Sequence, residues 1–439
     1  MSSEKIDRDT IRIRNPLAGP HRDRSGLRLQ GGRGLVPGDR TFATERRNPP
    51  IHTATPSTVR EVNRSIILNL IRRHQPISRA ELSQRTGIFR SNISDIADEL
   101  VGQDLVVEKR GIAAGRGRVP TLLSLNGNSF RVLAVSVRPS ETLVAAAGLT
   151  GKISKRVAFE TPRNPREFVR KLLKTIAQFH EQHPGKASGL QEIGVGVPGL
   201  VKASAGQVLW IPALPEYSGF ELAAEIEKRS GIPTAADNDS NLAALAELWV
   251  DETADLSDFV VLVIGDVGVG AGIILNRELY RGHDTSFAAE FGHMTIDLAG
   301  AECSCGRRGC WELYVSDRAT WQRYLPKSRT EFDPSRFQEL LDLAHQGDQQ
   351  ALGALGETAK YLSVGISNIF LALNPEVIIV AGCIARAWDL IQNTVVRSFS
   401  PPGLNVPIRT ARPDLEQLYL RGAIRLALRK AFAKPKLGW

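Results

Sequence analysis

The chain has 439 residues, 42% hydrophobic and 23% charged, which excludes wholesale disorder, a collagen-like repeat and a coiled-coil rod. It has no run of about 18 apolar residues, no secretion signal and only four cysteines, so we expect a cytoplasmic protein without membrane insertion or a disulfide scaffold. The whole net charge of +9 lies in the first 126 residues, since residues 127–439 hold 34 basic and 34 acidic groups, and this asymmetry favours a nucleic-acid-binding front end over a solvated basic tail.

The first 55 residues are rich in Arg, Gly and Pro and show no sustained apolar period. Such a composition cannot bury enough apolar surface to fold. We therefore expect residues 1–55 to form a basic, mostly disordered arm that adds at most a non-specific attraction for phosphates.

Residues 56–126 predict a winged helix-turn-helix domain. A first helix over 58–74 ends at Gln75-Pro76, since proline disfavours helical geometry in the residue before it. A capping box formed by Ser78 and Glu81 opens a short second helix that stops near Gly87, and a third helix covers 90–102. The spacing of Val62, Ile66, Leu70 and Ile71 places these four residues on one face of the first helix.

Two short strands after the third helix, around 105–107 and 122–125, flank a basic tip and predict a hairpin wing. The third helix would offer short polar groups to the major groove, and the arginines between glycines in the tip would suit a narrow minor groove. The candidate DNA contacts are Arg90, Ser91, Asn92, Ser94, Arg116 and Arg118. The alternative is a three-helix protein-interaction module with a polar outer face.

From residue 131 onward strands and helices alternate. The predicted strands cover 132–137, 143–147, 193–197, 234–236, 259–264 and 377–381, and the predicted helices cover 165–180, 220–230, 242–250 and 359–373. Hairpins followed by crossover helices, repeated in two halves, indicate an α/β fold with two lobes and a cleft.

A metal site is the strongest single prediction. One imidazole and three thiols within 18 residues supply four soft ligands for a tetrahedral zinc ion, namely His293, Cys303, Cys305 and Cys310. Four protein ligands close the coordination sphere, so we expect a structural role. The alternatives are three unrelated cysteines or a disulfide. Cys383 stands apart and is interpreted as a small core residue.

Polar residues at a predicted strand end give a second candidate site. Asn238 and Asp239 could take adjacent hydroxyls of a polyol, and a carboxylate there could act as a general base. Helix capping explains the same residues equally well on spacing alone. Glu290 and Glu312 flank the metal-ligand loop, which would hold both carboxylates in position. The glycine-rich run 267–272 resembles a phosphate-cradling loop, a weak signal by itself.

Four motifs together resemble the ROK family of repressors, open reading frames and sugar kinases. They are Gly194–Gly199, Asn238-Asp239, Glu290–His293 and the Cys-x-Cys-x4-Cys loop. The resemblance covers 127–439 and implies an actin-like sugar-kinase (ribonuclease H-like) domain of two lobes. The preceding winged helix resembles that of the family's repressor branch, which includes the xylose, N-acetylglucosamine and Mlc-type regulators.

The resemblance also implies roles for individual residues. A sugar would be held by Asn238, Asp239, Glu290, His293 and Glu312, with a backbone contact from Gly199. In a kinase member the residue at the position of Asp239 is the catalytic base. His293 would bind zinc through one ring nitrogen and face the sugar with the other.

Three stretches depart from the kinase pattern of this family. Kinase members carry Asp-x-Gly-Gly-Thr after the first strand, whereas this chain has Ser136–Ser140, with Arg138 and Pro139 in place of two glycines. The Gly-Thr-Gly loop is replaced by Asp266–Gly268, and the adenosine loop reads Ala381–Cys383. All three nucleotide elements are altered while the sugar elements are retained.

The sequence thus predicts a regulator and not an enzyme. We expect a repressor of carbohydrate-utilisation genes that binds a double-stranded DNA operator as a homodimer or homotetramer and responds to a sugar or sugar phosphate effector. The alternatives are a sugar kinase with a fused DNA-binding head and a regulator controlled by a protein partner.

Overall fold

The computed structural model describes residues 55–432 except 112–118, 128, 130, 182–189, 251–252, 254, 267, 284–287, 327–331, 398–406 and 412–413. The basic arm, apart from Thr55, and the wing tip with Arg116 and Arg118 lie outside the described residues, so these expectations stay predictions. Within the described segments, no helix combines the length and the apolar character needed to cross a membrane.

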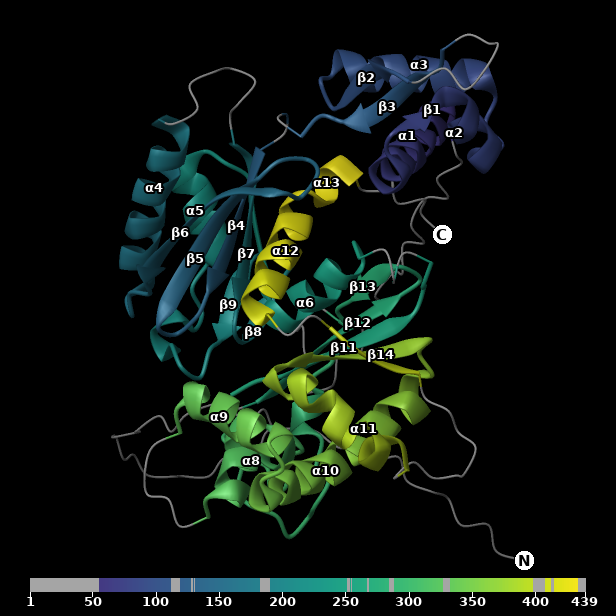
Figure 1. Ribbon diagram of the computed structural model, residues 1–439. Coiled ribbons are helices and arrows are strands. Elements are labelled where there is room, and N and C mark those ends of the chain that lie inside the picture. Colours follow the sequence, from purple (N-terminus) through teal and green to yellow (C-terminus); the bar gives the residue numbers. More distant parts are fainter. Residues whose placement is uncertain are drawn as a thin grey trace, which may run out of the picture. The chain divides into compact units, whose positions relative to one another are not determined.

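The N-terminal part contains the three expected helices and the expected hairpin (Figure 1). The helices are α1 (Pro56–His74), α2 (Arg79–Thr86) and α3 (Arg90–Gly102), and the antiparallel sheet has the order β1-β3-β2, with β1 Ile77–Ser78, β2 Val106–Arg110 and β3 Thr121–Leu125. The capping box is confirmed: Ser78 Oγ accepts from Glu81 N at 3.2 Å, and Glu81 Oε2 accepts from Ser78 N at 3.0 Å. Gly87 ends α2 with φ +71°, which favours glycine.

The four residues predicted to share one face of α1 are buried to different degrees, and Leu70 packs against the core. Val62, Ile66 and Leu70 are only partly buried, whereas Ile67 and Leu68 are fully buried together with Ile71. The reason is tertiary, because α1 packs against α3 and β3 and also against the C-terminal helix α13 (Arg429–Phe432). On that side the side chains of Ser65 and Asn69 donate to the carbonyl oxygen of Phe432 at 3.3 and 3.2 Å.

Two five-stranded sheets repeat one topology, as the alternation of strands and helices predicted. The first has the order β10-β7-β4-β5-β6 and the second β15-β14-β11-β12-β13; in each, an antiparallel meander of three strands is extended by two parallel strands. The strands of the first sheet are β4 Arg131–Val137, β5 Glu141–Ala147, β6 Ile153–Glu160, β7 Leu190–Val197 and β10 Thr234–Asn238. Those of the second are β11 Phe259–Ile264, β12 Val269–Leu275, β13 Glu278–Tyr280, β14 Val377–Gly382 and β15 Ile408–Thr410. A small hairpin joins β8 Leu200–Lys202 and β9 Gln207–Trp210.

Helices cover the two sheets and lie between them. The first sheet packs with α4 (Pro165–Glu181) and α5 (Leu222–Ser230), and the second with helices that include α8 (Asp317–Tyr324), α9 (Pro334–His345), α10 (Gln349–Leu373) and α11 (Trp388–Arg397). Two further helices, α6 (Asp239–Glu247) and α12 (Leu415–Ala427), contact each other. Since α12 packs on β4 and β7 and α6 packs on β11 and β12, this pair connects the two sheets (Figure 1).

Caps explain where two helix predictions were displaced. The helix expected over 242–250 begins at Asp239, because Asn238 caps it, and the helix expected from 359 begins at Gln349, because Asp348 accepts from Ala351 N at 2.7 Å. Caps of this kind use single polar residues, which an apolar period does not reveal.

The glycine-rich run is not a phosphate-cradling loop. Its residues from Val269 onward belong to β12, which pairs along its length with β11. A Cβ atom on Gly270 would lie 2.0 Å from Ser240 Oγ, and one on Gly272 would lie 2.6 Å from the Ser240 carbonyl oxygen. The glycines therefore let α6 pack closely against the strand.

Candidate functional site

Asn238 lies at the carboxyl end of β10 and caps α6. Its Oδ1 accepts from the backbone N–H groups of Ser240 and Asn241 at 2.8 and 3.3 Å, so the capping interpretation is confirmed. Its Nδ2 donates to the carbonyl oxygen of Gly199 at 2.8 Å. A Cβ atom at Gly199 would lie 2.3 Å from the Trp210 carbonyl oxygen, so this close approach requires glycine. The amide of Asn238 thus ties the strand β10 to the turn after β7.

Asp239 is the first residue of α6, beside that cap. Its Oδ1 accepts from Ser240 Oγ at 3.3 Å. Burial raises the pKa of Asp239 from 3.8 to about 6, although the nearby Arg138 acts in the opposite direction. A carboxyl group with this pKa exchanges its proton near neutral pH, which suits a group that accepts hydrogen bonds from hydroxyls.

Asp237 was missed by the sequence reasoning although it fixes the start of α6. It is buried, and its Oδ2 accepts from Nε and Nη2 of Arg281 at 2.9 and 2.6 Å. Its Oδ1 accepts from the Asn238 backbone N–H at 2.9 Å and from Asn241 Nδ2 at 2.8 Å. A polar run marks this residue, but Arg281 lies 44 positions away and leaves no signal in the sequence.

His293, Cys303, Cys305 and Cys310 come together as predicted. Their potential ligand atoms all lie within 4.8 Å of one another, with 3.6 Å between Cys303 Sγ and His293 Nδ1 and 3.5 Å between Cys305 Sγ and Cys310 Sγ. Metal–ligand bonds of about 2.0–2.3 Å in a tetrahedron give ligand separations of about 3.5–3.8 Å. The four side chains therefore fit a tetrahedral metal ion. Cys383 is partly buried against the core of the second sheet and takes no part in this cluster.

Glycines shape the loop that carries these ligands. A Cβ atom on Gly292 would lie 2.3 Å from the Val269 carbonyl oxygen, and one on Gly309 would lie 1.6 Å from that of Asp297. The N–H of Trp311 donates to the Met294 carbonyl at 2.9 Å, which joins the two ends of the loop next to the last cysteine. The metal-ligand loop is thereby fastened to β12 on one side and to the core on the other.

Three carboxylates gather beside this loop. Glu312, at the start of the short helix α7 (Glu312–Val315), is nearly buried, and its Oε1 lies 3.0 Å from Cys303 Sγ and 3.4 Å from His293 Nδ1. Burial, together with the carboxylates of Asp239 and Glu312, raises the pKa of Glu290 to about 7. The structure therefore brings Asp239, Glu290 and Glu312 to one place, next to His293.

The stretches that differ from the kinase pattern either form a tight turn or carry acidic side chains. Ser136 is buried in β4, and Arg138 begins a tight turn in which its N–H donates to the Glu141 carbonyl at 3.1 Å. Asp266 follows the strand β11, and Asp317 begins the helix α8. Burial raises the pKa of Asp266, and burial together with the carboxylate of Asp266 raises the pKa of Asp317. The Oδ1 of Asp317 is buried and has no hydrogen-bond partner among the described residues. A nucleotide phosphate at these two residues would meet carboxyl groups instead of glycine N–H donors.

The helix α3 presents an exposed polar surface. Arg90, Ser91 and Asn92 are exposed and Ser94 is half-buried. Phe89, directly before the helix, has 79% of its surface exposed. Sequence reasoning did not select Phe89; its signal is an apolar residue at a helix start that is otherwise polar.

Comparison with known proteins gives consistent matches. The model of the ROK family matches residues 133–412. The xylose repressor of Bacillus subtilis is 31% identical over 338 residues, which cover 77% of this chain and 86% of that protein. The DNA-binding transcriptional dual regulator NagC of Escherichia coli is 24% identical over 383 residues, covering 84% and 93%. A solved ROK family transcriptional regulator, a homologue of the E. coli MLC protein, superposes with a TM-score of 0.72 at 25% identity, covering 85% of this chain and 98% of its own.

Proposed function

Because the chain belongs to the ROK family, we propose that it is a transcriptional repressor whose affinity for DNA changes when a sugar binds beside Asp239. The observation that carries the proposal is the cluster of three carboxylates, from Asp239, Glu290 and Glu312. The same chain has a three-helix N-terminal part in which α3 exposes a polar surface. The names of the relatives make xylose and N-acetylglucosamine the first sugars to test.

The proposal divides the chain into three parts. Residues 1–55 form a basic arm, residues 56–126 a winged helix-turn-helix domain that binds DNA, and residues 127–439 a sugar-binding domain with its metal loop at 293–310. A cytoplasmic location agrees with these roles. The resemblance in fold to a ROK regulator over 85% of the chain supports this division.

In the sugar site, carboxylates would accept hydrogen bonds from sugar hydroxyls. Asp239, Glu290 and Glu312 would supply these acceptors. The Asn238 amide already caps α6, so its main role would be to position Asp239, with a smaller contribution to sugar binding. The second ring nitrogen of His293 would face the sugar. The Gly199 carbonyl is fixed by Asn238 and would shape the wall of the site.

Zinc is the metal that best suits the cluster of His293, Cys303, Cys305 and Cys310, because thiolates and imidazole are its preferred ligands. Four protein ligands leave no open position, so the ion would be structural. When bound it would cross-link the loop. The chain's own part is to hold the imidazole of His293 and the carboxylate of Glu312 at the sugar site.

On DNA, a symmetric homodimer, or a homotetramer built from two dimers, would place α3 of two chains in successive major grooves of a pseudo-palindrome. Arg90, Ser91, Asn92 and Ser94 would meet base edges or phosphates there. Arg116 and Arg118 of the wing tip would enter the minor groove.

Phosphoryl transfer is not part of the proposed function, because Arg138, Pro139 and Asp266 replace residues of the nucleotide elements and a second acid, Asp317, lies near Asp266. The deciding experiment measures operator affinity of the metal-loaded protein with and without xylose, N-acetylglucosamine and their phosphates, and ADP release with Mg-ATP in parallel. A sugar that shifts operator affinity without ADP release is expected. ADP release that disappears in Asp239→Asn would establish a kinase, and a response to no sugar would favour control by a protein partner.

Asn92→Ala is expected to weaken operator binding by roughly 5- to 100-fold, since an amide that reads a base contributes about 1–3 kcal/mol. Its salt dependence should stay that of the unsubstituted protein, because Asn92 carries no charge. Asn368→Ala removes an exposed amide from α10 and is the matched control. Fluorescence anisotropy at several salt concentrations checks both. Equal affinities for the two variants would remove Asn92 from the interface.

Asp239→Asn is expected to lower sugar affinity by roughly 10- to 100-fold and still to raise stability at pH 8. The native pKa of about 6 exceeds the ordinary 3.8, so the folded state binds the proton more tightly and stability falls as pH rises from about 4 to about 6. Asparagine avoids that loss, a gain on the order of 1 kcal/mol at pH 8 for this partly exposed group and about half of that at pH 5. Melting temperatures at both pH values test it, with the exposed Glu339→Gln as control. A gain of the same size at pH 5 would show that burial of the charge is not its cause.

A further inference from the structure

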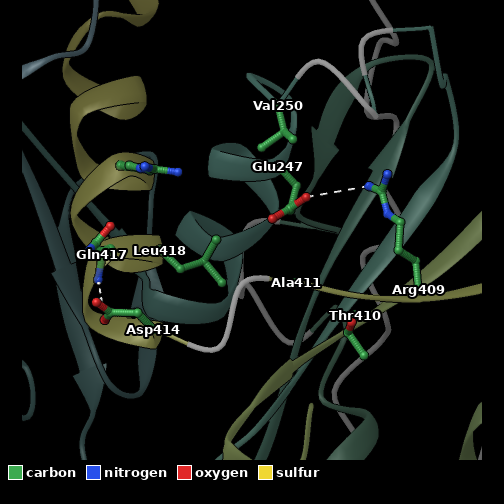
Figure 2. Close-up of a pocket in the computed structure, with 9 residues that line it drawn as sticks. Glu247, Val250, Arg409, Thr410, Ala411, Asp414, Gln417 and Leu418 are labelled. Atoms are coloured by element: carbon green, nitrogen blue, oxygen red, sulfur yellow. Dashed lines mark hydrogen bonds and ion pairs between the residues drawn. The ribbon is translucent and has the colours of Figure 1, made fainter. Parts of the chain in front are cut away.

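A cavity lies at the other end of α6 from the candidate sugar site. It has a volume of about 120 Å³ and is formed by the end of α6, the strand β15 and the first turns of α12 (Figure 2). Its lining residues are Glu247, Val250, Arg409, Thr410, Ala411, Asp414, Gln417, Leu418 and Arg421. Glu247 follows Asp239 by eight positions, a rise of about 12 Å along α6, so the cavity is separate from the carboxylate cluster.

Arg409 has an unmatched donor in this cavity. Its Nη2 atom is buried and has no hydrogen-bond partner among the described residues. It lies 3.7 Å from Glu247 Oε2, close enough for an ion pair but too far for a hydrogen bond (Figure 2). A guanidinium group only donates, so it needs an acceptor at this point.

The acids around the cavity are already engaged, whereas a second cation is not. Asp414 caps α12 by accepting from Gln417 N at 3.0 Å, and the nearly buried Glu247 pairs with Arg409 (Figure 2). Arg421 is exposed and forms no hydrogen bond or ion pair within the described part of the chain. Two guanidinium groups at the cavity therefore have donors to spare: Arg409 of β15, whose Nη2 has no hydrogen-bond partner among the described residues despite its ion pair with Glu247, and Arg421 of α12.

We propose that this cavity binds a small oxyanion, a phosphate group or a short carboxylate, between Arg409 and Arg421. Planar guanidinium groups match the geometry of both anions. The cavity is much larger than the roughly 10–15 Å³ that one water needs and smaller than the roughly 300–1,000 Å³ of pockets that enclose drug-sized ligands. Its size therefore suits an anion of a few heavy atoms and not a nucleotide.

The bound anion would link the two sheets. Arg409 belongs to β15 of the second sheet, and Arg421 belongs to α12, which packs on β4 and β7 of the first. An anion held by both side chains favours the arrangement of the sheets in which they converge, and by linkage it changes the affinity for any ligand that binds between the sheets. This consequence rests on the proposed sugar-responsive function, whereas the anion site itself does not.

The test is a calorimetric titration of inorganic phosphate into the metal-loaded full-length protein in a low-salt buffer without other oxyanions. We expect one saturable site per chain with a Kd of about 1 mM or lower. Arg409→Gln and Arg421→Gln should each weaken it at least tenfold. The matched control is Arg229→Gln on α5, where the arginine pairs with its helical neighbour Glu225 at 3.9 Å. It should bind phosphate like the unsubstituted protein.

Arg421 is exposed, so Arg421→Gln is expected to fold even if Arg409→Gln does not. Melting temperatures of the two variants show whether Arg409→Gln has lost its fold. Unsaturable heat, or equal affinity in Arg421→Gln and Arg229→Gln, would overturn the site. Acetate and sugar phosphates, titrated as competitors, distinguish a carboxylate and a phosphate carried by a larger molecule from free phosphate. A sugar affinity that is the same with and without phosphate would overturn the linkage alone. Failure of every sugar to bind would reject the proposed function and leave phosphate binding to be judged separately.

Discussion

Cys305→Ser is expected to lose the bound metal and, with it, most of the sugar affinity. Cys305 is half-exposed and lies 3.5 Å from Cys310 Sγ, so serine changes little in packing but replaces a thiolate ligand with a neutral hydroxyl. The remaining three ligands hold the ion far less tightly, because the free energy of a structural site depends on all four. Without the ion the loop no longer fixes His293 and Glu312, so sugar affinity should fall roughly 10- to 100-fold.

Metal content per chain and sugar titration measure the two effects. Cys383→Ser makes the same chemical change outside the cluster and should keep about one ion per chain and full sugar affinity. If Cys305→Ser retained its metal, the ligand set would be wrong. If it lost the metal and kept the sugar affinity, the loop would be structural and the sugar site would not depend on it.

Gly365→Ala is expected to destabilise the protein although alanine favours helices. Gly365 lies in α10, where a Cβ atom would stand 2.0 Å from Cε2 of the fully buried Trp311. The indole cannot move away easily, because its Nε1 donates to the Tyr361 carbonyl at 2.8 Å and the residue follows Cys310 directly. Overpacking of this kind costs about 1–3 kcal/mol, and more where backbone must shift.

Gly353, in the same helix, provides the control. A Cβ atom there meets nothing within 4 Å, so Gly353→Ala should stabilise the protein by about 0.5–1 kcal/mol. Urea unfolding should therefore give shifts of opposite sign for the two variants. Adding Trp311→Leu should remove most of the cost of Gly365→Ala. Two stabilising shifts would show that the indole does not pack against this turn of the helix.

The predictions from sequence were most successful where the signal is local. The capping box of Ser78 and Glu81 depends on residues three positions apart, and the predicted cluster from His293 to Cys310 lies within 18 residues. Alternation of apolar runs was enough to predict the two-halved α/β fold, although the edge strands β6, β13 and β15 were missed. No residue of β6 is fully buried, and β13 and β15 have three residues each, so the apolar patterns of these edge strands are weak.

Tertiary packing decided what local patterns could not. The buried face of α1 is set by its second contact, in which Ser65 donates to the Phe432 carbonyl 367 positions away. The run 267–272 resembled a phosphate-cradling loop because glycines serve either purpose, and only the packing of α6 on β12 shows that the glycines of the strand allow close packing.

For the candidate site, the sequence by itself determined which residues are candidates for metal and sugar binding, because Asn238, Asp239, Glu290 and the cysteine loop form short motifs. Only the tertiary structure brought Asp239 to Glu290 and Glu312, paired Asp237 with Arg281, and placed Arg409 beside Glu247 in a separate cavity. The physical reason is that hydrogen bonds, charge coupling and burial depend on distances in space. Residues 44 or 162 positions apart leave no periodicity from which such distances can be inferred.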